Sequence, residues 1–258
     1  LNTATITPES LPELLSFFCG RLSDWASVEP SLHAIRAIYD LHLSPGLCSG
    51  WEDSEAVLDT DTAELSALLG TDSFGGPLRN WSLTSRVLRK ILIHVHAPSF
   101  GKSVRLEVQS LFLHWLTEFE SELSPLWPLV SIGLTMESED ERDPDCLLLL
   151  FQSLTILATK EITNEDELFE TCLSSYFSSL SDDTSSPLFE AMRSAFIAFG
   201  VRSVAFLLPF LNDPRKSEAA FVILSRCTCS MDDLMVAELH KFSEIPRLLG
   251  ELWKKIEI

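Results

Sequence analysis

The chain has 258 residues and a formal net charge of −19, from 38 acidic and 19 basic side chains. Because a strongly acidic protein is repelled by phosphate backbones and anionic lipid, we expect no direct binding to nucleic acid or to a membrane. Hydrophobic residues make up 46% of the chain, as in ordinary folded proteins, and the longest apolar runs are too short to span a bilayer.

Apolar residues recur at three- and four-residue spacing along the whole chain, which is the spacing of one face of an α-helix. One stripe runs from Leu11 to Trp25. Another runs from Val104 to Phe119, so that Phe112 and Trp115 are predicted to lie in the core. The predicted helices span residues 8–25, 31–43, 54–69, 82–97, 102–121, 125–136, 145–159, 165–180, 187–199, 201–211, 216–229, 231–242 and 246–257.

Several helix starts carry a capping hydroxyl followed by proline, at Thr7-Pro8, Ser124-Pro125 and Ser186-Pro187. Asn164 and Glu167 have the spacing of a capping box. No stretch alternates between apolar and polar residues at period two, so no strand is predicted.

The short helices and short connections predict antiparallel helix pairs of about 40 residues, the period of HEAT and armadillo repeats. The predicted fold is all-α, a HEAT/armadillo-like helical-repeat solenoid, with residues 1–258 as a single helical-repeat domain of about six helix pairs. A compact helical bundle is the competing architecture. The solenoid is preferred because apolar stripes run the whole length and no helix that is apolar all round stands out.

Two acidic segments interrupt the helices, one beginning at residues 51–55 and one at residues 137–145. Both are interpreted as solvated charge, because a catalytic carboxyl needs burial or a close partner to raise its pKa. Residues 71–80 and 178–186 read as polar loops.

Six cysteines are scattered through apolar helical stretches, a pattern that favours reduced, buried thiols over a disulfide framework. Such thiols indicate the cytoplasm or the nucleus. The cysteines are Cys19, Cys48, Cys146, Cys172, Cys227 and Cys229.

No motif for catalysis or for a cofactor is present in the sequence. The acidic run at residues 59–64 lacks the glycine and the alternating ligands of a calcium loop. The pairs Cys227/Cys229 and His94/His96 point to different faces of a helix, so neither is a ready zinc chelate. Neither a Gly-x-Ser-x-Gly elbow nor a P-loop occurs. The prediction is therefore a non-enzymatic chain without catalytic, cofactor-binding or metal-binding residues.

One region is locally basic and is the candidate protein-docking face. Two interpretations stay open beside a plain solvated surface: a docking edge for an acidic partner segment, or pairing with an acidic loop of the same chain. The residues are Arg79, Arg86, Arg89, Lys90, Lys102 and Arg105.

Four segments, in this order and spacing, resemble the MMS-nineteen family. Residues 11–25 with 32–38 are similar to an early helical repeat of that family, and residues 140–148 are similar to a charged loop that leads into an apolar helix. Residues 167–177, with Cys172 and Tyr176-Phe177, and residues 206–211 are similar to the segments that follow.

The resemblance implies a HEAT-type adaptor of the cytosolic iron–sulfur protein assembly targeting complex, without a cluster of its own. Its implied partners are WD-repeat and other subunits of that complex and iron–sulfur apoproteins such as DNA helicases, which links it to DNA repair and replication in cytoplasm and nucleus. The resemblance also implies that the chain is the N-terminal part of a longer solenoid, and because the first residue is Leu1 and not methionine, we expect the chain to be a segment of a longer protein. The alternative function is a generic helical-repeat adaptor, such as a regulator of transport or of a kinase complex.

Overall fold

The structure, a computed structural model, describes residues 6–7, 10–43, 83–123, 127–138, 140–160, 165–179 and 186–200, and single positions between 203 and 224. Within these residues every regular element is a helix, as the apolar periodicity predicts. None of the described helices has the length and apolar character that crossing a bilayer requires. The helices are α1 (Leu11–Arg21), α2 (Val28–His42), α4 (Leu83–His94), α5 (Lys102–Glu118), α6 (Glu120–Leu123), α7 (Trp127–Ser138), α8 (Pro144–Leu157), α9 (Glu165–Ser179) and α10 (Pro187–Phe199), with 3-10 turns η2 (Trp25–Ser27) and η5 (Ala97–Ser99).

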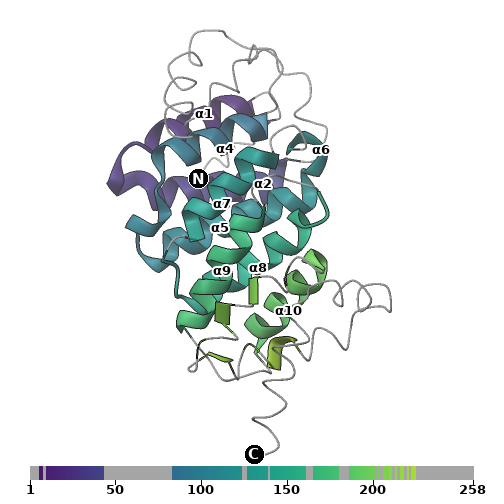
Figure 1. Cartoon of the computed structure of the whole chain (residues 1–258). Coiled ribbons are helices and arrows are strands. Elements are labelled where there is room, and N and C mark those ends of the chain that lie inside the picture. The colour runs from purple at the N-terminus through teal and green to yellow at the C-terminus, as the bar shows by residue number, and fades with distance from the viewer. Residues whose placement is uncertain are drawn as a thin grey trace, which may run out of the picture.

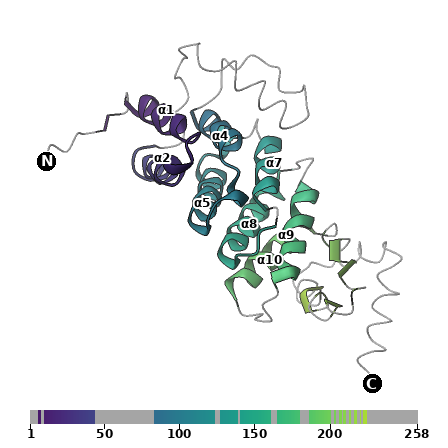
Figure 2. The same cartoon turned by 90° about the vertical axis from the view of Figure 1, so that its left-hand side faces the viewer.

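The long helices form two rows, which Figures 1 and 2 show from two sides. One row contains α2, α5, α8 and α10, and each of these helices packs against the next. The other row contains α1, α4, α7 and α9, in which α1 packs against α4 and α7 against α9. Successive helices along the chain therefore alternate between rows, and the fold is an all-α helical-repeat solenoid. The number of helix pairs in the whole chain stays a prediction.

The core lies between the two rows and contains the second predicted stripe in full. Phe112 is 1% exposed and Trp115 is 0% exposed, which confirms both as core residues. Tyr39 on α2 contacts the edge of Trp115, with ring centroids 5.3 Å apart. Because α5 buries its stripe against both neighbouring helices of its row, it holds the centre of the described solenoid together.

The first stripe ends earlier than predicted. Helix α1 stops at Arg21, and Trp25 lies in η2 with 64% of its surface exposed. Asp24 starts this turn by accepting hydrogen bonds from the Ala26 backbone N–H (3.3 Å) and the Ser27 hydroxyl (2.7 Å). Its side chain thus competes with the helical backbone pattern, so that the prediction of a helix through residue 25 was wrong. Trp25 instead stacks on Phe100, with ring centroids 4.0 Å apart.

The predicted helix over 187–199 agrees with α10 at both ends. The Ser186 hydroxyl accepts from the Phe189 backbone N–H at 3.2 Å, and Gly200 follows the helix with a φ of 62°. The predicted start at Thr7-Pro8 was wrong, because Thr7 and Ser10 form a hydrogen-bonded turn before α1. The predicted caps at Ser124 and Asn164 and the predicted helices at 54–69, 231–242 and 246–257 lie outside the described residues.

Candidate functional site

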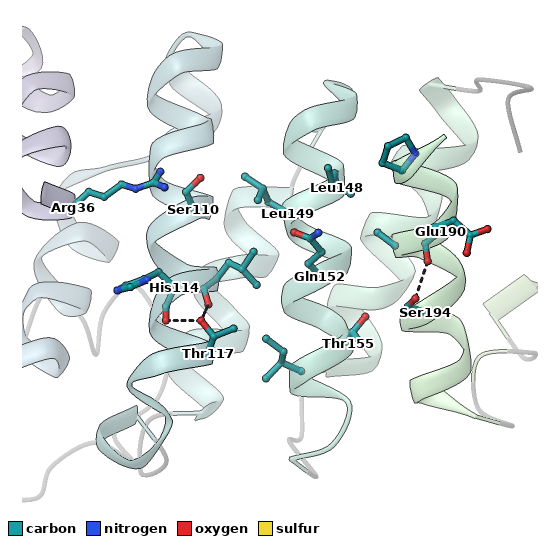
Figure 3. A pocket seen from close by; sticks show the side chains of 14 residues that line it. Arg36, Ser110, His114, Thr117, Leu148, Leu149, Gln152, Thr155, Glu190 and Ser194 are labelled. Carbon is teal, nitrogen blue, oxygen red and sulfur yellow. Dashed lines mark hydrogen bonds between the residues drawn. The ribbon is translucent and has the colours of Figure 1, made fainter. Parts of the chain in front are cut away.

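A groove of about 810 Å³ runs over the row of α2, α5, α8 and α10. It is lined by Arg36 on α2, by residues 110–117 on α5, by residues 148–156 on α8 and by residues 187–194 on α10. Figure 3 shows these side chains arranged helix by helix across the surface. The groove thus draws on residues from successive repeats and on two turns each of α5, α8 and α10.

Helix α8 gives the groove its apolar character because it is apolar on two sides. Its inner side packs into the core through side chains such as Phe151 and Leu154, both 0% exposed. On its outer side, Leu148, Leu149 and Ile156 line the groove and are half-buried. No charged residue occurs between positions 146 and 159. Gln152 and Thr155 also line the groove from α8, so this helix is not apolar all round.

Between Arg36 at the α2 end and Glu190 on α10, neutral polar side chains along the groove offer hydrogen-bond acceptors. The hydroxyls of Thr117, Thr155 and Ser194 each donate to a carbonyl of their own helix, at distances of 2.8 to 3.1 Å. Their oxygen lone pairs remain available to accept a further hydrogen bond. The Gln152 amide lies at the middle of α8 and forms no hydrogen bond with the described residues. The groove can therefore accept backbone N–H groups all along its length.

The α2 end of the groove carries a charged cluster. Glu107 on α5 is 8% exposed and contacts Arg36 (3.6 Å) and His33 (3.3 Å) of α2. Arg36 also contacts Asp40 at 3.5 Å, and His114 approaches the same carboxylate at 4.0 Å. These ion pairs link α2 to α5 and place carboxylates beside the groove.

A second polar cluster joins the start of α5 to the loop between α7 and α8. Arg105 donates to the Glu141 carboxylate at 2.8 Å. Lys102 contacts Asp143 at 3.0 Å and Asp145 at 2.6 Å. Basic residues of the predicted docking face are thus paired with an acidic loop of the same chain, as one of the two interpretations proposed.

Solvated charge was the wrong interpretation for Glu137 and Glu141 of this acidic segment, whereas Asp140 and Asp145 are exposed as expected. Glu141 is 4% exposed and Glu137 is 2% exposed. Besides Arg105, Glu141 accepts hydrogen bonds from the backbone N–H groups of Arg142 (2.9 Å) and Asp143 (2.8 Å). Burial, together with the nearby Glu141 charge and against a backbone hydrogen bond from Ala97, raises the pKa of Glu137 to about 8. Ion pairing of Glu141 and protonation of Glu137 offset the free-energy cost of removing these two carboxyl groups from water.

The other predicted docking residues do not gather beside Lys102 and Arg105. Arg89 on α4 is 1% exposed, so it lies in the interior and not on a surface. Arg86 and Lys90 are half-buried on the same helix, and Arg79 lies outside the described residues. Docking of an acidic partner at these residues stays a prediction. The groove was not predicted from the sequence.

The described cysteines Cys19, Cys146 and Cys172 are buried and free, as predicted, while the other predicted thiols lie outside the described residues. Burial raises the pKa of each of the three to about 12, so the nucleophilic, metal-binding thiolate is disfavoured at neutral pH. Within the described residues, no three His, Cys, Asp or Glu side chains converge as metal ligands. His96 contacts the Ser99 hydroxyl at 2.9 Å.

A stacked helical array with a groove across its repeats defines a protein-interaction scaffold of the helical-repeat class. A family model described as MMS19_N, Dos2-interacting transcription regulator of RNA-Pol-II, matches residues 1–178. The chain therefore belongs to the MMS19_N family, as the resemblance of its early segments predicted. Comparisons with curated proteins and with solved structures gave no match.

Proposed function

We propose that this chain is a non-catalytic adaptor that helps to deliver cytosolic iron–sulfur clusters to apoproteins, among them enzymes of DNA repair and replication. The observation that carries the proposal is the family match over residues 1–178, joined to a solenoid whose groove spans successive repeats. An adaptor needs surfaces that hold two proteins near each other rather than a reactive group. The partners we propose are WD-repeat and other subunits of the targeting complex and the client apoproteins, in cytoplasm and nucleus.

The proposal predicts a defect in client maturation when the protein is removed from its own cells. Cells are labelled with radioactive iron, and an iron–sulfur DNA helicase is immunoprecipitated. We expect the iron bound per helicase molecule to fall while the amount of a non-client iron protein, and its iron, stay constant. Re-expression of the protein should restore the iron content. Unchanged iron in the helicase after complete depletion would contradict the proposal.

A second candidate function comes from the family description, which names regulation of transcription by RNA polymerase II. The two functions differ in what changes first after acute depletion. Cluster delivery predicts early loss of helicase iron with later changes in transcription, whereas direct regulation predicts altered nascent RNA while client iron is still normal. Affinity purification from cytosol separates both from a generic transport or kinase adaptor, because only cluster delivery predicts co-purification of a WD-repeat subunit with iron–sulfur apoproteins.

A further inference from the structure

We propose that the groove over α5, α8 and α10 binds an extended segment of a partner protein that carries alternating apolar side chains and a basic residue at the α2 end. The proposal deepens the proposed function by assigning a docking surface and the chemistry of its ligand. It rests on the adaptor role alone and not on which complex the adaptor serves.

The outer stripe of α8 is the first reason. On a surface helix of an acidic chain, the outward positions are normally charged. Here the positions of Leu148, Leu149 and Ile156 repeat at helical spacing on the outward side, and the segment 146–159 contains no charge. An apolar stripe bordered by polar side chains on a soluble surface is typical of a site for a partner.

The dimensions of the groove suit a short extended chain. Packed helices lie 8–10 Å apart, so the path from α5 to α10 is roughly 20 Å long. An extended chain rises ~3.3 Å per residue and crosses that path with about six residues. A helix, which rises ~1.5 Å per residue, would need about thirteen residues for the same path.

The hydrogen-bonding groups along the groove match an extended backbone. Thr117, Thr155 and Ser194 have already given their hydroxyl hydrogens to their own helices, so each can accept an N–H from a ligand. Gln152 can both donate and accept from the centre of the path, and Figure 3 shows its side chain on α8, between the labelled residues of α5 and those of α10. An extended chain exposes such backbone groups, whereas a helix satisfies them internally.

The carboxylates beside the α2 end of the groove favour a ligand with a basic residue. At the α2 end, Asp40 and Glu107 outnumber the single guanidinium of Arg36. The Asp40 side chain is 43% exposed, so it can attract a cation of a ligand. At the α10 end, Glu190 pairs with Arg193 at 3.1 Å. A basic residue is thus drawn to α2. A second copy of the chain, with a net charge of −19, is repelled.

Selection from a random dodecapeptide phage library on the purified full chain tests the proposal. Leu149→Ser is the main variant, because Leu149 lines the groove without belonging to the buried core cluster or to the side chains packed against it. The matched control is Leu41→Ser, since Leu41 is 74% exposed and lies outside the groove lining. Circular dichroism confirms that each variant is folded.

We expect the library to enrich peptides with alternating apolar residues and an excess of Lys and Arg. A labelled synthetic copy should bind the unchanged chain and Leu41→Ser equally and bind Leu149→Ser about tenfold more weakly, a loss of one buried apolar contact. Asp40→Asn should weaken binding about threefold and reduce its dependence on salt, whereas Glu13→Gln on α1 should change neither.

Four results would overturn the proposal. The first two are a selection that enriches no peptide, and enriched peptides that bind Leu149→Ser as tightly as the unchanged chain. The other two are enrichment of acidic peptides, and a dimer in sedimentation that Leu149→Ser dissociates, which would make a second copy the occupant. Because the assay uses the purified chain alone, normal helicase iron after depletion leaves peptide binding standing. Absent peptide binding likewise leaves the delivery role standing.

Discussion

Two contact regions between helices of the solenoid, here called joints, differ in their side chains: one is formed by charged groups and the other by aromatic rings. The polar joint, where α5 meets the loop between α7 and α8, consists of Lys102, Arg105, Glu137, Glu141, Asp143 and Asp145. The aromatic joint, where α9 and α10 meet the chain beyond α10, consists of Phe169, Phe196, Phe199 and Phe206. Each joint has a buried part, which is Glu137 and Glu141 in the polar joint and Phe169, Phe196 and Phe199 in the aromatic joint.

The difference follows from which parts of the helices meet. At the polar joint a helix begins, and the first N–H groups of a helix have no partner within it. Asp143 accepts from the backbone N–H groups of Asp145 (3.0 Å) and Cys146 (3.4 Å), so that its charge satisfies the start of α8. At the aromatic joint the described contacts are between apolar rings, which fill the space without any need for charge.

Removing a ring from the aromatic joint should give the largest effect. Phe169 is 0% exposed and stacks on Phe199, with ring centroids 4.4 Å apart. We expect Phe169→Ala to lower the free energy of unfolding by ~3–5 kcal/mol, measured by urea denaturation. Phe17→Ala, which truncates a ring that is 55% exposed, is the control and should change stability by less than about 0.5 kcal/mol. Equal losses for both variants would show that the joint is not packed as described.

Breaking the polar joint should cost less. Arg105→Met leaves the Glu141 carboxylate, which is 2% exposed at the side chain, without its cation. Because Arg105 keeps 21% of its side chain in water, we expect a loss of about 2–3 kcal/mol rather than the full cost of a buried charge. Adding Glu141→Gln should recover part of the loss in a double-mutant cycle. Additive losses in this cycle would mean that the two side chains do not interact.

The pH dependence of stability sharpens the comparison, because only the polar joint titrates. The pKa of Glu137 rises from 4.5 to about 8 on folding, so the folded chain holds a proton that the unfolded chain releases. Its stabilising contribution is complete below pH 4.5, falls as pH rises toward 8, and then stays constant. Glu137→Gln should therefore gain stability over the unchanged chain by about 1 kcal/mol per pH unit across this window.

Thermal denaturation at a series of pH values measures this gain. Glu118→Gln, which neutralises an exposed carboxylate on α5, is the control and should follow the unchanged chain. A constant difference between Glu137→Gln and the unchanged chain at all pH values would show that Glu137 is ionised in the folded state. The aromatic-joint variant Phe169→Leu should lose stability by the same amount at every pH.

The sequence predicted the fold far better than it predicted the candidate site. Helix boundaries depend on nearby residues, and Ser186-Pro187 with Gly200 determine α10 at both ends. The polar joint pairs Arg105 with a carboxylate 36 positions away, and the groove needs α5, α8 and α10 side by side. Such contacts depend on how the helices stack, which apolar spacing does not specify. The charge-free outer stripe of α8 was the signal in the sequence that could have located the groove.

The smallest expected effect concerns Lys102, and it tests whether distance alone makes an ion pair stabilising. Lys102 lies closer to Asp145 (2.6 Å) than Arg105 lies to Glu141 (2.8 Å). Hydrogen bonds to Asp145 and Asp143 raise the pKa of Lys102, so its charge is constant across neutral pH. Its side chain is nevertheless 46% exposed and that of Asp145 is 63% exposed, so water and salt screen the pair. We expect Lys102→Ala to shift the melting temperature far less than Arg105→Met does. Added salt should abolish the small remaining difference in melting temperature between Lys102→Ala and the unchanged chain. A shift as large as that of Arg105→Met would show that the number of charges, and not their burial, determines how much the polar joint stabilises the fold.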